Sequence, residues 1–321
     1  MKAMLVAMVA AVAMLANPLA AEPRQVRIAY ITSELSPGHV NARLFSEAME
    51  KRMPGVFAFK LYPNGQLGGE EALIDSLQAG SLEMGILASG MTKVVRKVGV
   101  FDLPWLFDDR AHVRRALAGP LGEQVFKEVE KRSGMTPLGI YENGFRHVIN
   151  SKRAIVTPAD MKGLKIRVAG GKVRRALFAA MGANPAPVDW TETFTAMQTG
   201  VVDGAEAGIY GFYEAKLGEV GKYLSLTKHI YSPSFMMASN AFVASLTPDQ
   251  RKAMREVSVA ITDAVFNESE SNENKFMEEM RKMVQINEVD LASFRTQTDK
   301  VYKDFIADQG DDWIKLIRAA R

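Results

Sequence analysis

The sequence predicts an α/β protein of two lobes that are joined by crossing strands. Strand-like and helix-like segments alternate in two successive blocks, 26–132 and 135–205, which is the pattern of α/β architecture. The 321 residues are enough for two domains, and no Pro-rich or Gly/Ser-rich linker separates the blocks. Several strands are therefore expected to cross between the lobes as a hinge. From about residue 235 the chain is mostly charged amphipathic helix, which we expect to return and brace both lobes.

The first 21 residues are typical of a secretory signal peptide. Lys2 precedes an uncharged apolar run over 3–16, and the small pair Ala20, Ala21 follows. This run is shorter than the ~20 residues that a membrane-spanning helix needs. We expect the segment to be cleaved and the mature protein to be exported and soluble. An uncleaved N-terminal anchor is the alternative.

In the first block, each expected strand is a short apolar run, and each expected helix carries apolar residues at helical spacing. Strands are expected at 26–31, 56–61 and 84–88, and helices at 41–53, 70–79 and 111–132, the last interrupted by Gly119-Pro120. Breaker residues separate these elements: a turn at 62–65, Gly80 after the second helix, and a loop at 101–105.

In the second block the same alternation continues. Strands are expected at 136–141, 147–150, 164–168 and 201–205, and helices from Thr157, over 172–181, and from Asp189 to Gly200. Pro158 suits the first turn of a helix, and Asp189 with Glu192 resembles a capping box.

Beyond the second block, 235–238 and 241–244 are strand-like, and Thr247-Pro248 with Gln250 predicts a second capping box. The expected organisation is then a signal peptide at 1–21, the first part of lobe I at 22–145 and lobe II at 146–234. The remainder, 235–321, is expected to hold a hinge-crossing strand and a helical region that returns to lobe I.

The composition excludes several functional classes. The 40 Lys and Arg residues are scattered among 37 Asp and Glu, so the net charge of +3 predicts no nucleic-acid-binding face. The sequence contains no cysteine, which excludes structural disulfides, thiol nucleophiles and Cys-based metal sites.

No catalytic, cofactor-binding or metal-binding motif is present in the sequence. The four histidines lack the H-x-x-x-H spacing of zinc proteases, and G-x-S-x-G, Walker A and G-x-G-x-x-G patterns are absent. Gly170-Gly171-Lys172 is followed by Val173, where a phosphate loop needs Ser or Thr. We expect no catalytic residue, metal or cofactor. A Ser/His/Asp triad assembled from distant residues stays open, because such triads are recognised by geometry.

Two arginines stand at the ends of expected strands, Arg146 in Asn143–His147 and Arg167 in Lys165–Val168. The planar guanidinium offers a fork of donors that matches a carboxylate in two parallel bonds. These residues therefore predict an anion clamp. The alternative is that each arginine pairs with an acidic residue at the surface.

Six segments stand in the order that is found in one family of binding proteins. They are Tyr62-Pro63-Asn64-Gly65-Gln66-Leu67-Gly68-Gly69-Glu70, Phe101-Asp102-Leu103-Pro104, Asn143-Gly144-Phe145-Arg146-His147, Met161-Lys162-Gly163-Leu164-Lys165-Ile166-Arg167-Val168, Gly182-Ala183-Asn184-Pro185, and Gln198-Thr199-Gly200-Val201-Val202-Asp203-Gly204-Ala205-Glu206. With these segments the chain resembles, from about residue 26 to past 250, the DctP-type solute-binding proteins of tripartite ATP-independent periplasmic (TRAP) transporters.

This resemblance implies a periplasmic binding protein fold, with two α/β lobes, hinge strands and a long bracing helix. It implies a periplasmic receptor, rather than an enzyme, that captures a small organic acid. The implied partners are the small and large membrane subunits of a sodium-coupled permease. A monomer is the expectation from the family.

The resemblance also implies roles for single residues. Arg167 is similar to the principal carboxylate-binding arginine, and Arg146 to a second arginine that contacts the same carboxylate or another acceptor. Trp190 matches an aromatic position that packs the carbon skeleton of the ligand, with burial under a helix start as the alternative. Glu70 and Ser89 match cleft positions on the first lobe, and Glu70 equally suits the N-terminus of a helix.

Further implied cleft positions are His229, Glu206, Tyr210 and the backbone at Gly170. A structural histidine is the alternative for His229, and ordinary helix core is the alternative for Tyr210.

The chain departs from many relatives at two places. Ala207 stands where relatives have a carboxylate-binding Asn, and Ala169-Gly170-Gly171 replaces a Pro, which leaves room or backbone donors beside the clamp. The ligand therefore stays open among sugar acids, hydroxy or keto acids, aromatic acids and dicarboxylates. Two other functions stay open as well: an exported hydrolase or lyase that acts on a small carboxylate, and a receptor that reports to a sensor kinase or another type of permease.

Overall fold

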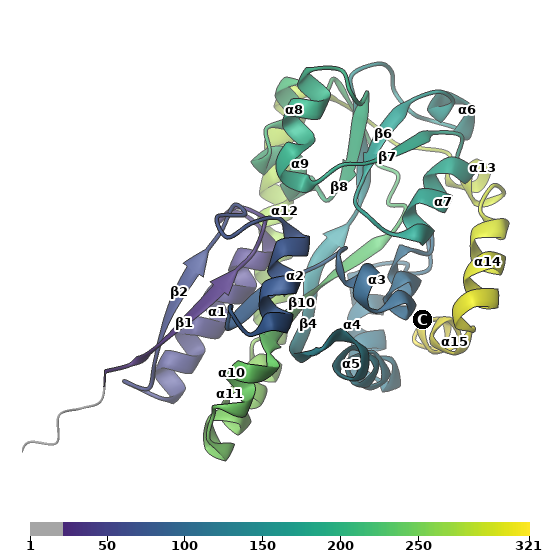
Figure 1. Cartoon of the computed structure of the whole chain (residues 1–321). Coiled ribbons are helices and arrows are strands. Elements are labelled where there is room, and N and C mark those ends of the chain that lie inside the picture. The colour runs from purple at the N-terminus through teal and green to yellow at the C-terminus, as the bar shows by residue number, and fades with distance from the viewer. Residues whose placement is uncertain (1–21) are drawn as a thin grey trace, which may run out of the picture.

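The computed structural model of the protein describes residues 22–321, so the predicted signal peptide lies outside the described residues. The described chain forms two lobes, each built around one β-sheet with helices packed on it (Figure 1). The α/β class and the two lobes agree with the sequence prediction.

The first lobe contains a five-stranded sheet of order β2-β1-β3-β10-β4. Its strands are β1 (Arg24–Ala29), β2 (Phe57–Tyr62), β3 (Met84–Leu87), β4 (Met135–Phe145) and β10 (Tyr231–Ser239). β1 pairs in parallel with β2 and β3, whereas β10 runs antiparallel to β3 and β4. The parallel strands end at the same edge, so the loops that follow β1 and β3 face the second lobe.

The second lobe contains a six-stranded sheet of order β11-β9-β5-β8-β6-β7. Its strands are β5 (His147–Asn150), β6 (Lys165–Val168), β7 (Asn184–Pro187), β8 (Gly204–Ala207), β9 (Tyr223–Ser225) and β11 (Gln285–Asn287). β6 pairs in parallel with β7 and β8, and β5 pairs antiparallel with β8.

The helices of the first part of the chain are α1 (Pro37–Arg52), α2 (Glu70–Ala79), α3 (Met91–Val94), the 3₁₀ helix η1 (Arg96–Asp102), α4 (Arg110–Ala118) and α5 (Pro120–Ser133). Those of the second lobe are α6 (Pro158–Met161), α7 (Lys172–Ala180), η2 (Trp190–Glu192), α8 (Thr193–Gln198), α9 (Ile209–Glu214) and η3 (Leu217–Glu219). The C-terminal helices are α10 (Asn240–Ala244), α11 (Pro248–Ala260), α12 (Thr262–Met283), α13 (Leu291–Arg295), α14 (Asp299–Gln309) and α15 (Asp312–Ala319).

Two segments cross between the sheets side by side. One passes from β4 to β5 through Arg146, and the other passes from β9 back to β10. They are hydrogen-bonded to each other, because Arg146 N–H donates to the Ile230 carbonyl at 3.0 Å and His229 N–H donates to the Arg146 carbonyl at 3.1 Å. Arg146 therefore lies in the connection between the lobes.

The C-terminal region braces both lobes. The 22-residue helix α12 packs on α1 and β4 of the first lobe and on α9 of the second (Figure 1). β11 then joins the edge of the second sheet, α14 packs on α7 and η1, and α15 packs on α4 and α5. Among residues 22–321, no helix is both long and apolar enough to cross a membrane.

Most predicted elements form, with corrections at several ends. The helix at 70–79 and the strand at 147–150 have the predicted bounds, whereas β4 continues past 141 to Phe145. The segment 241–244, predicted as strand-like, is helix α10, because the Ser239 side chain caps it by accepting from Phe242 N–H at 3.1 Å.

Other corrections concern the second lobe. The strand predicted at 201–205 begins later, as β8, and β7, β9 and β11 were not predicted. The capping box expected at Asp189 does not form, because the Asp189 side chain makes no cap hydrogen bond. The segment 101–105, expected to be loop, begins in η1. The capping box at Thr247 with Gln250 is confirmed.

Candidate functional site

A pocket lies between the two lobes, beside the crossing segments. With its open mouth it contains about 960 Å³ of space that atoms do not fill. Residues of both lobes line it. Of the residues singled out in the sequence, Glu70, Ser89, Arg146, Arg167, Gly170, Trp190 and Tyr210 line this pocket.

Arg167 presents an unpaired charge to this pocket. It is the third residue of β6 and is 3% exposed. Its Nε donates to the Val188 carbonyl at 2.8 Å, which fixes the plane of the guanidinium, and its Cζ lies 5.3 Å from the centre of the Trp190 ring. Among residues 22–321, no acceptor binds its Nη1 and Nη2, and no acidic side chain forms a salt bridge with it.

The electrostatics of Arg167 follow from this geometry. Burial lowers the pKa of Arg167 to about 10, and the nearby charges of Arg146 and Arg174 act in the same direction, while Glu206 opposes them. A guanidinium removed from water without a counter-ion costs several kcal/mol. An anion bound at Nη1 and Nη2 would offset that cost, so Arg167 is prepared for an anionic ligand.

Arg146 also lines the pocket, but an acidic residue neutralises it. Its Nε donates to Glu206 Oε2 at 2.5 Å, and its Nη2 donates to the Glu206 carbonyl at 2.9 Å. Only Nη1 is left without a partner among the described residues. Arg146 can therefore offer its Nη1 group to a ligand, and its charge is already compensated.

Glu206 is the centre of a buried ion network beneath the pocket. Its Oε1 accepts from Arg174 Nη1 at 3.2 Å and from Ala169 N–H at 3.1 Å. Burial alone would raise the pKa of Glu206, but Arg146 and Arg174 hold that pKa well below its usual value. Glu206 is thus held in its charged form by its two arginine partners, and it compensates both of them.

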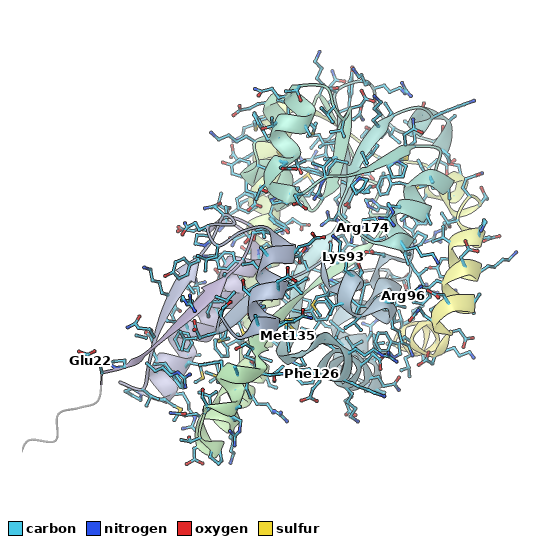
Figure 2. All side chains as sticks on the ribbon, viewed as in Figure 1. Glu22, Lys93, Arg96, Phe126, Met135 and Arg174 are labelled. Carbon is cyan, nitrogen blue, oxygen red and sulfur yellow. The ribbon has the colours of Figure 1, made fainter. Side chains whose placement is uncertain are left out.

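Arg174 connects this network to the first lobe. Its Nη1 also donates to Ser89 Oγ at 2.9 Å, and its Nη2 pairs with Asp102. Figure 2 places Arg174 and Lys93 where the two lobes meet. The side chain of Arg174 is 1% exposed, so this junction between the lobes is closed to solvent.

The structure does not bring Glu206 and His229 to the pocket wall, which corrects the sequence prediction for both. Both side chains are fully buried. His229 Nδ1 lies 2.8 Å from Thr227 Oγ1, its Nε2 lies 3.6 Å from Glu206 Oε2, and burial lowers its pKa. The structural alternative for His229 therefore holds. Glu206 influences the pocket by holding and neutralising Arg146, which lines it, and Arg174.

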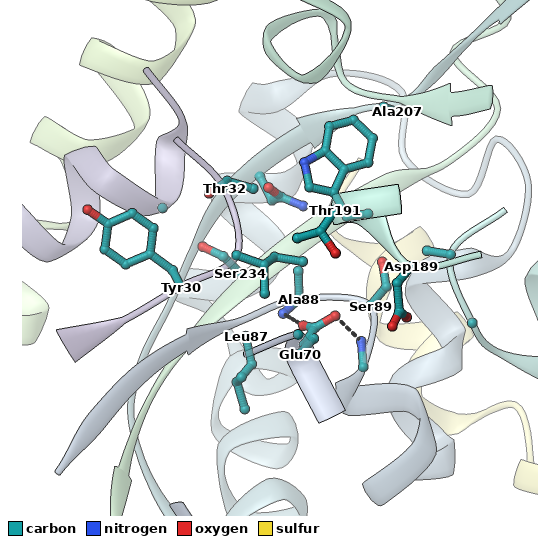
Figure 3. A pocket seen from close by; sticks show the side chains of 18 of the residues that line it. Tyr30, Thr32, Glu70, Leu87, Ala88, Ser89, Asp189, Thr191, Ala207 and Ser234 are labelled. Atoms are coloured by element: carbon teal, nitrogen blue, oxygen red, sulfur yellow. Dashed lines mark hydrogen bonds between the residues drawn. The ribbon is translucent and has the colours of Figure 1, made fainter. Parts of the chain in front are cut away.

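The first lobe contributes a polar wall. Glu70 is the first residue of α2, and its two oxygens accept from the N–H groups of Ala88 and Gly90, the latter at 2.9 Å (Figure 3). These bonds fix the turn that presents Ser89. Since Ser89 Oγ accepts from Arg174, its O–H hydrogen is free to donate into the pocket. Burial raises the pKa of Glu70.

Trp190 and Tyr210 line the pocket from the second lobe. Trp190 lies in η2 and is partly exposed, so the alternative of a tryptophan buried under the helix start is wrong. Tyr210 is buried in α9, and its hydroxyl donates to Asn143 Oδ1 at 2.5 Å. Asn143, which also lines the pocket, was not predicted as a site residue.

The two departures noted in the sequence have different outcomes. Ala207, noted as a departure from relatives with an Asn, lines the pocket with a methyl group in place of an amide. The room expected beside Gly170 is filled, because a Cβ added there would lie 2.9 Å from Cε of Lys93 in the first lobe. The N–H of Ala169 is not available to a ligand either, since it donates to Glu206.

Sequence reasoning missed Arg174, which pairs with both Asp102 and Glu206 at the site. Its signal was weak, because an arginine at the start of the helix 172–181 is ordinary there and its partners Asp102 and Glu206 are distant along the chain. Among the described residues, no group of three or more His, Asp or Glu side chains is arranged to hold a metal ion.

Comparison with known proteins gives one consistent result. A sequence model of the bacterial extracellular solute-binding proteins of family 7 matches residues 28–309. The 2,3-diketo-L-gulonate-binding periplasmic protein YiaO of Escherichia coli is 34% identical over 235 residues, 72% of this chain and 70% of that protein. The C4-dicarboxylate-binding periplasmic protein DctP of Rhodobacter capsulatus is 29% identical, covering 83% of this chain and 80% of its own length. A TRAP periplasmic solute-binding protein from Polaromonas sp. JS666, bound to D-erythronate, superposes with a TM-score of 0.89 at 31% identity, covering 92% of this chain and 98% of that one.

Proposed function

The chain belongs to family 7 of the bacterial extracellular solute-binding proteins, and we propose that it binds one small organic acid through Arg167 and delivers it to a TRAP permease. Its family and its structural neighbours are solute-binding receptors, which decides against the exported hydrolase or lyase left open by the sequence. The general class of the protein is therefore that of a TRAP solute-binding receptor for small organic acids.

The observation that carries the clamp is the unpaired, buried guanidinium of Arg167. Its Nε is held by the Val188 carbonyl and its face lies over Trp190, so Nη1 and Nη2 project as a fixed pair of donors. Two parallel charge-assisted hydrogen bonds from this pair would bind a carboxylate in one orientation. The remaining Nη1 of Arg146 is available for a third bond.

The charges of the pocket favour a ligand with a single carboxylate. Three cations line the pocket, and two of them are compensated: Lys93 pairs with Glu71, and Arg146 pairs with Glu206. Arg167 is the one cation of the lining without an acidic partner among residues 22–321. A second carboxylate on the ligand would meet Glu70 across the pocket, where like charges repel.

The rest of the pocket suits a hydroxylated carbon chain. Hydroxyls of Thr32, Ser89, Thr191 and Ser234 line it together with the carboxylate of Glu70 (Figure 3). The Trp190 ring offers a flat apolar face for C–H groups. A hydroxy acid or sugar acid with one carboxylate therefore matches the lining better than a dicarboxylate or a purely apolar acid.

The delivery step rests on family membership. We expect the closed, ligand-bound lobes to be the form that the small and large membrane subunits recognise, with import driven by a sodium gradient. The receptor is expected in the periplasm and as a monomer. Uptake of the identified acid by cells, lost on deletion of the membrane subunits, would distinguish this partner from a sensor kinase.

The first experiment is a thermal-shift screen of residues 22–321, because a ligand that binds only the folded state raises the melting temperature. The panel pairs each sugar acid with its neutral alcohol, for example D-galactonate with galactitol, and adds succinate as a dicarboxylate. We expect shifts with monocarboxylates alone. If a neutral alcohol raises the melting temperature as much as its acid does, the clamp is contradicted. If succinate raises the melting temperature more than the monocarboxylates do, the preference for a single carboxylate is contradicted.

A further inference from the structure

A further contact between the lobes lies in a groove next to the ligand pocket, and Trp190 lines both. Ser33, in the loop after β1 of the first lobe, donates to Glu214 Oε2 of the second lobe from its N–H at 3.1 Å and from its hydroxyl at 2.6 Å. Glu214 is the last residue of α9. The two residues are far apart in the sequence, and their contact exists only while the lobes are together.

The carboxyl group of Glu214 is only half satisfied in this contact, because both bonds from Ser33 go to Oε2. Its Oε1 is buried and has no partner among residues 22–321. Burial raises the pKa of Glu214 to about 7, although both Ser33 donors and Trp190 act in the opposite direction. A group with one unsatisfied oxygen holds the lobes less firmly than a fully satisfied one, so this contact can be released.

The contact is connected to the ligand site through shared residues. Ile31, Trp190 and Thr191 line the ligand pocket and also line an open groove whose walls include Ser33 and Glu214. Trp190 also contacts the ligand-binding arginine directly, because the guanidinium of Arg167 lies over its ring. A ligand that orders Trp190 therefore also orders the wall of the groove beside which Ser33 meets Glu214.

We propose that Ser33 and Glu214 form a latch that keeps the lobes closed over the ligand and sets the rate at which the ligand leaves. This inference rests on the proposed function. Both are positioning residues, since neither lines the ligand pocket. The contact from Arg174 to Ser89 and Asp102 also joins the lobes, but it is unsuited to this role because Arg174 compensates Glu206 inside the second lobe.

The kinetic test measures the dissociation and association rates of a bound acid, found by the thermal-shift screen, in four variants. Glu214→Ala removes the acceptor, so we expect dissociation to be about 10-fold faster, with an association rate within a factor of two of the wild type. Ser33→Ala keeps the backbone donor and should give a smaller acceleration. Glu214→Gln keeps an acceptor and should stay within about 3-fold of the wild type. Glu219→Ala, an exposed acid of the same lobe, is the matched control.

A second readout follows the lobes without any ligand. The sequence has no cysteine, so Asp75→Cys on α2 and Thr195→Cys on α8, both exposed, provide a single pair of spin labels, one on each lobe. In the ligand-free protein, Glu214→Ala should shift the distance distribution toward longer separations, and Glu219→Ala should not.

The outcomes separate the latch from the receptor. If the acid binds and Glu214→Ala leaves both its dissociation rate and the label distances unchanged, the latch is wrong and the receptor stands. If Glu214→Gln accelerates dissociation as much as Glu214→Ala, hydrogen bonding by Ser33 is not the cause and the latch is also wrong. If no acid binds the wild type, the proposed function fails, while the label distances still test whether Glu214 holds the lobes together.

Discussion

Arg146, in the connection between the lobes, and Arg167, in β6 of the second lobe, line the same pocket and are both at least nine-tenths buried, yet they differ in their partners. Two nitrogens of Arg146 donate hydrogen bonds to Glu206. Arg167 donates one hydrogen bond to a backbone carbonyl and forms no ion pair with an acidic residue among residues 22–321. Position in a cleft therefore does not decide which arginine binds a ligand. The pairing within the protein decides it, because only an uncompensated charge gains fully from an added anion.

The largest expected effect on stability comes from removing the carboxylate that pairs with Arg146. Glu206→Ala leaves Arg146 and Arg174 buried without their shared carboxylate, and such a loss costs about 3–5 kcal/mol. Denaturant unfolding should report a decrease in the free energy of unfolding of that size. Glu192→Ala, an exposed acid in η2, is the control and should change it by less than about 0.5 kcal/mol. A Glu206→Ala variant as stable as the control would show that the network contributes nothing.

Removing the unpaired charge of Arg167 should weaken ligand binding strongly and change the free energy of unfolding little. Arg167→Ala is expected to raise the dissociation constant of the bound acid by at least about 100-fold, since it leaves the carboxylate buried alone. The free energy of unfolding without ligand should fall by less than in Glu206→Ala or should rise, because no buried ion pair is broken. Calorimetric titration and denaturant unfolding on the same preparation measure both quantities. Near-unchanged affinity would refute the assignment.

A conservative change sharpens the same comparison. Arg167→Lys keeps the charge but loses the planar fork and the bond that Nε donates to the Val188 carbonyl. We expect binding about 10-fold weaker than in the wild type and clearly tighter than in Arg167→Ala. Titration of the three proteins under one buffer gives the order directly. Equal affinities of the lysine and arginine forms would mean that charge alone is recognised.

The smallest expected effect is on the pH dependence of the melting temperature. It follows from a second contrast, between Glu206, which has two arginine partners, and Glu214, which has none among the described residues. Two arginines hold the pKa of Glu206 well below its usual value, while burial raises that of Glu214 to about 7. The stability that a raised pKa contributes is present below the ordinary value of 4.5 and is lost as pH rises through about 7. The melting temperature of the wild type should therefore fall more between pH 5 and pH 8 than that of Glu214→Gln, which cannot ionise.

Thermal melts of the two proteins across this range, with Glu219→Ala as control, measure the difference. Identical pH profiles of the wild type and Glu214→Gln would place Glu214 in water and not in the closed contact.

Much of the fold is predictable because local signals agree with the tertiary structure. The helix at 70–79 combines apolar residues at helical spacing with Gly80, which takes a left-handed conformation at φ 76°. The segment 241–244 was mispredicted because its apolar residues suit either structure, and the Ser239 cap decides for helix. β7 contains two prolines and lies at the edge of the second sheet, where proline is tolerated but where sequence gives little sign of a strand.

The site was predictable where a residue acts through its own position and unpredictable where it acts through a distant partner. Arg146, Arg167, Trp190 and Glu70 all line the pocket as expected. Glu206 was misplaced because nothing near it in the sequence shows that Arg174 and Arg146 turn its carboxylate inward. For the same reason Arg174 was missed, since its partners become neighbours only in the folded protein.

The most direct test of the central claim is a double-mutant cycle between Arg167 and the ligand's carboxylate. Calorimetry would measure four affinities, those of the acid and of its neutral primary alcohol, each for the wild type and for Arg167→Ala. We predict that the substitution weakens the acid by at least about 100-fold and the alcohol by less than about 3-fold, a coupling of at least about 2 kcal/mol. Equal losses for acid and alcohol would contradict the account, because Arg167 would then support the pocket without binding the carboxylate.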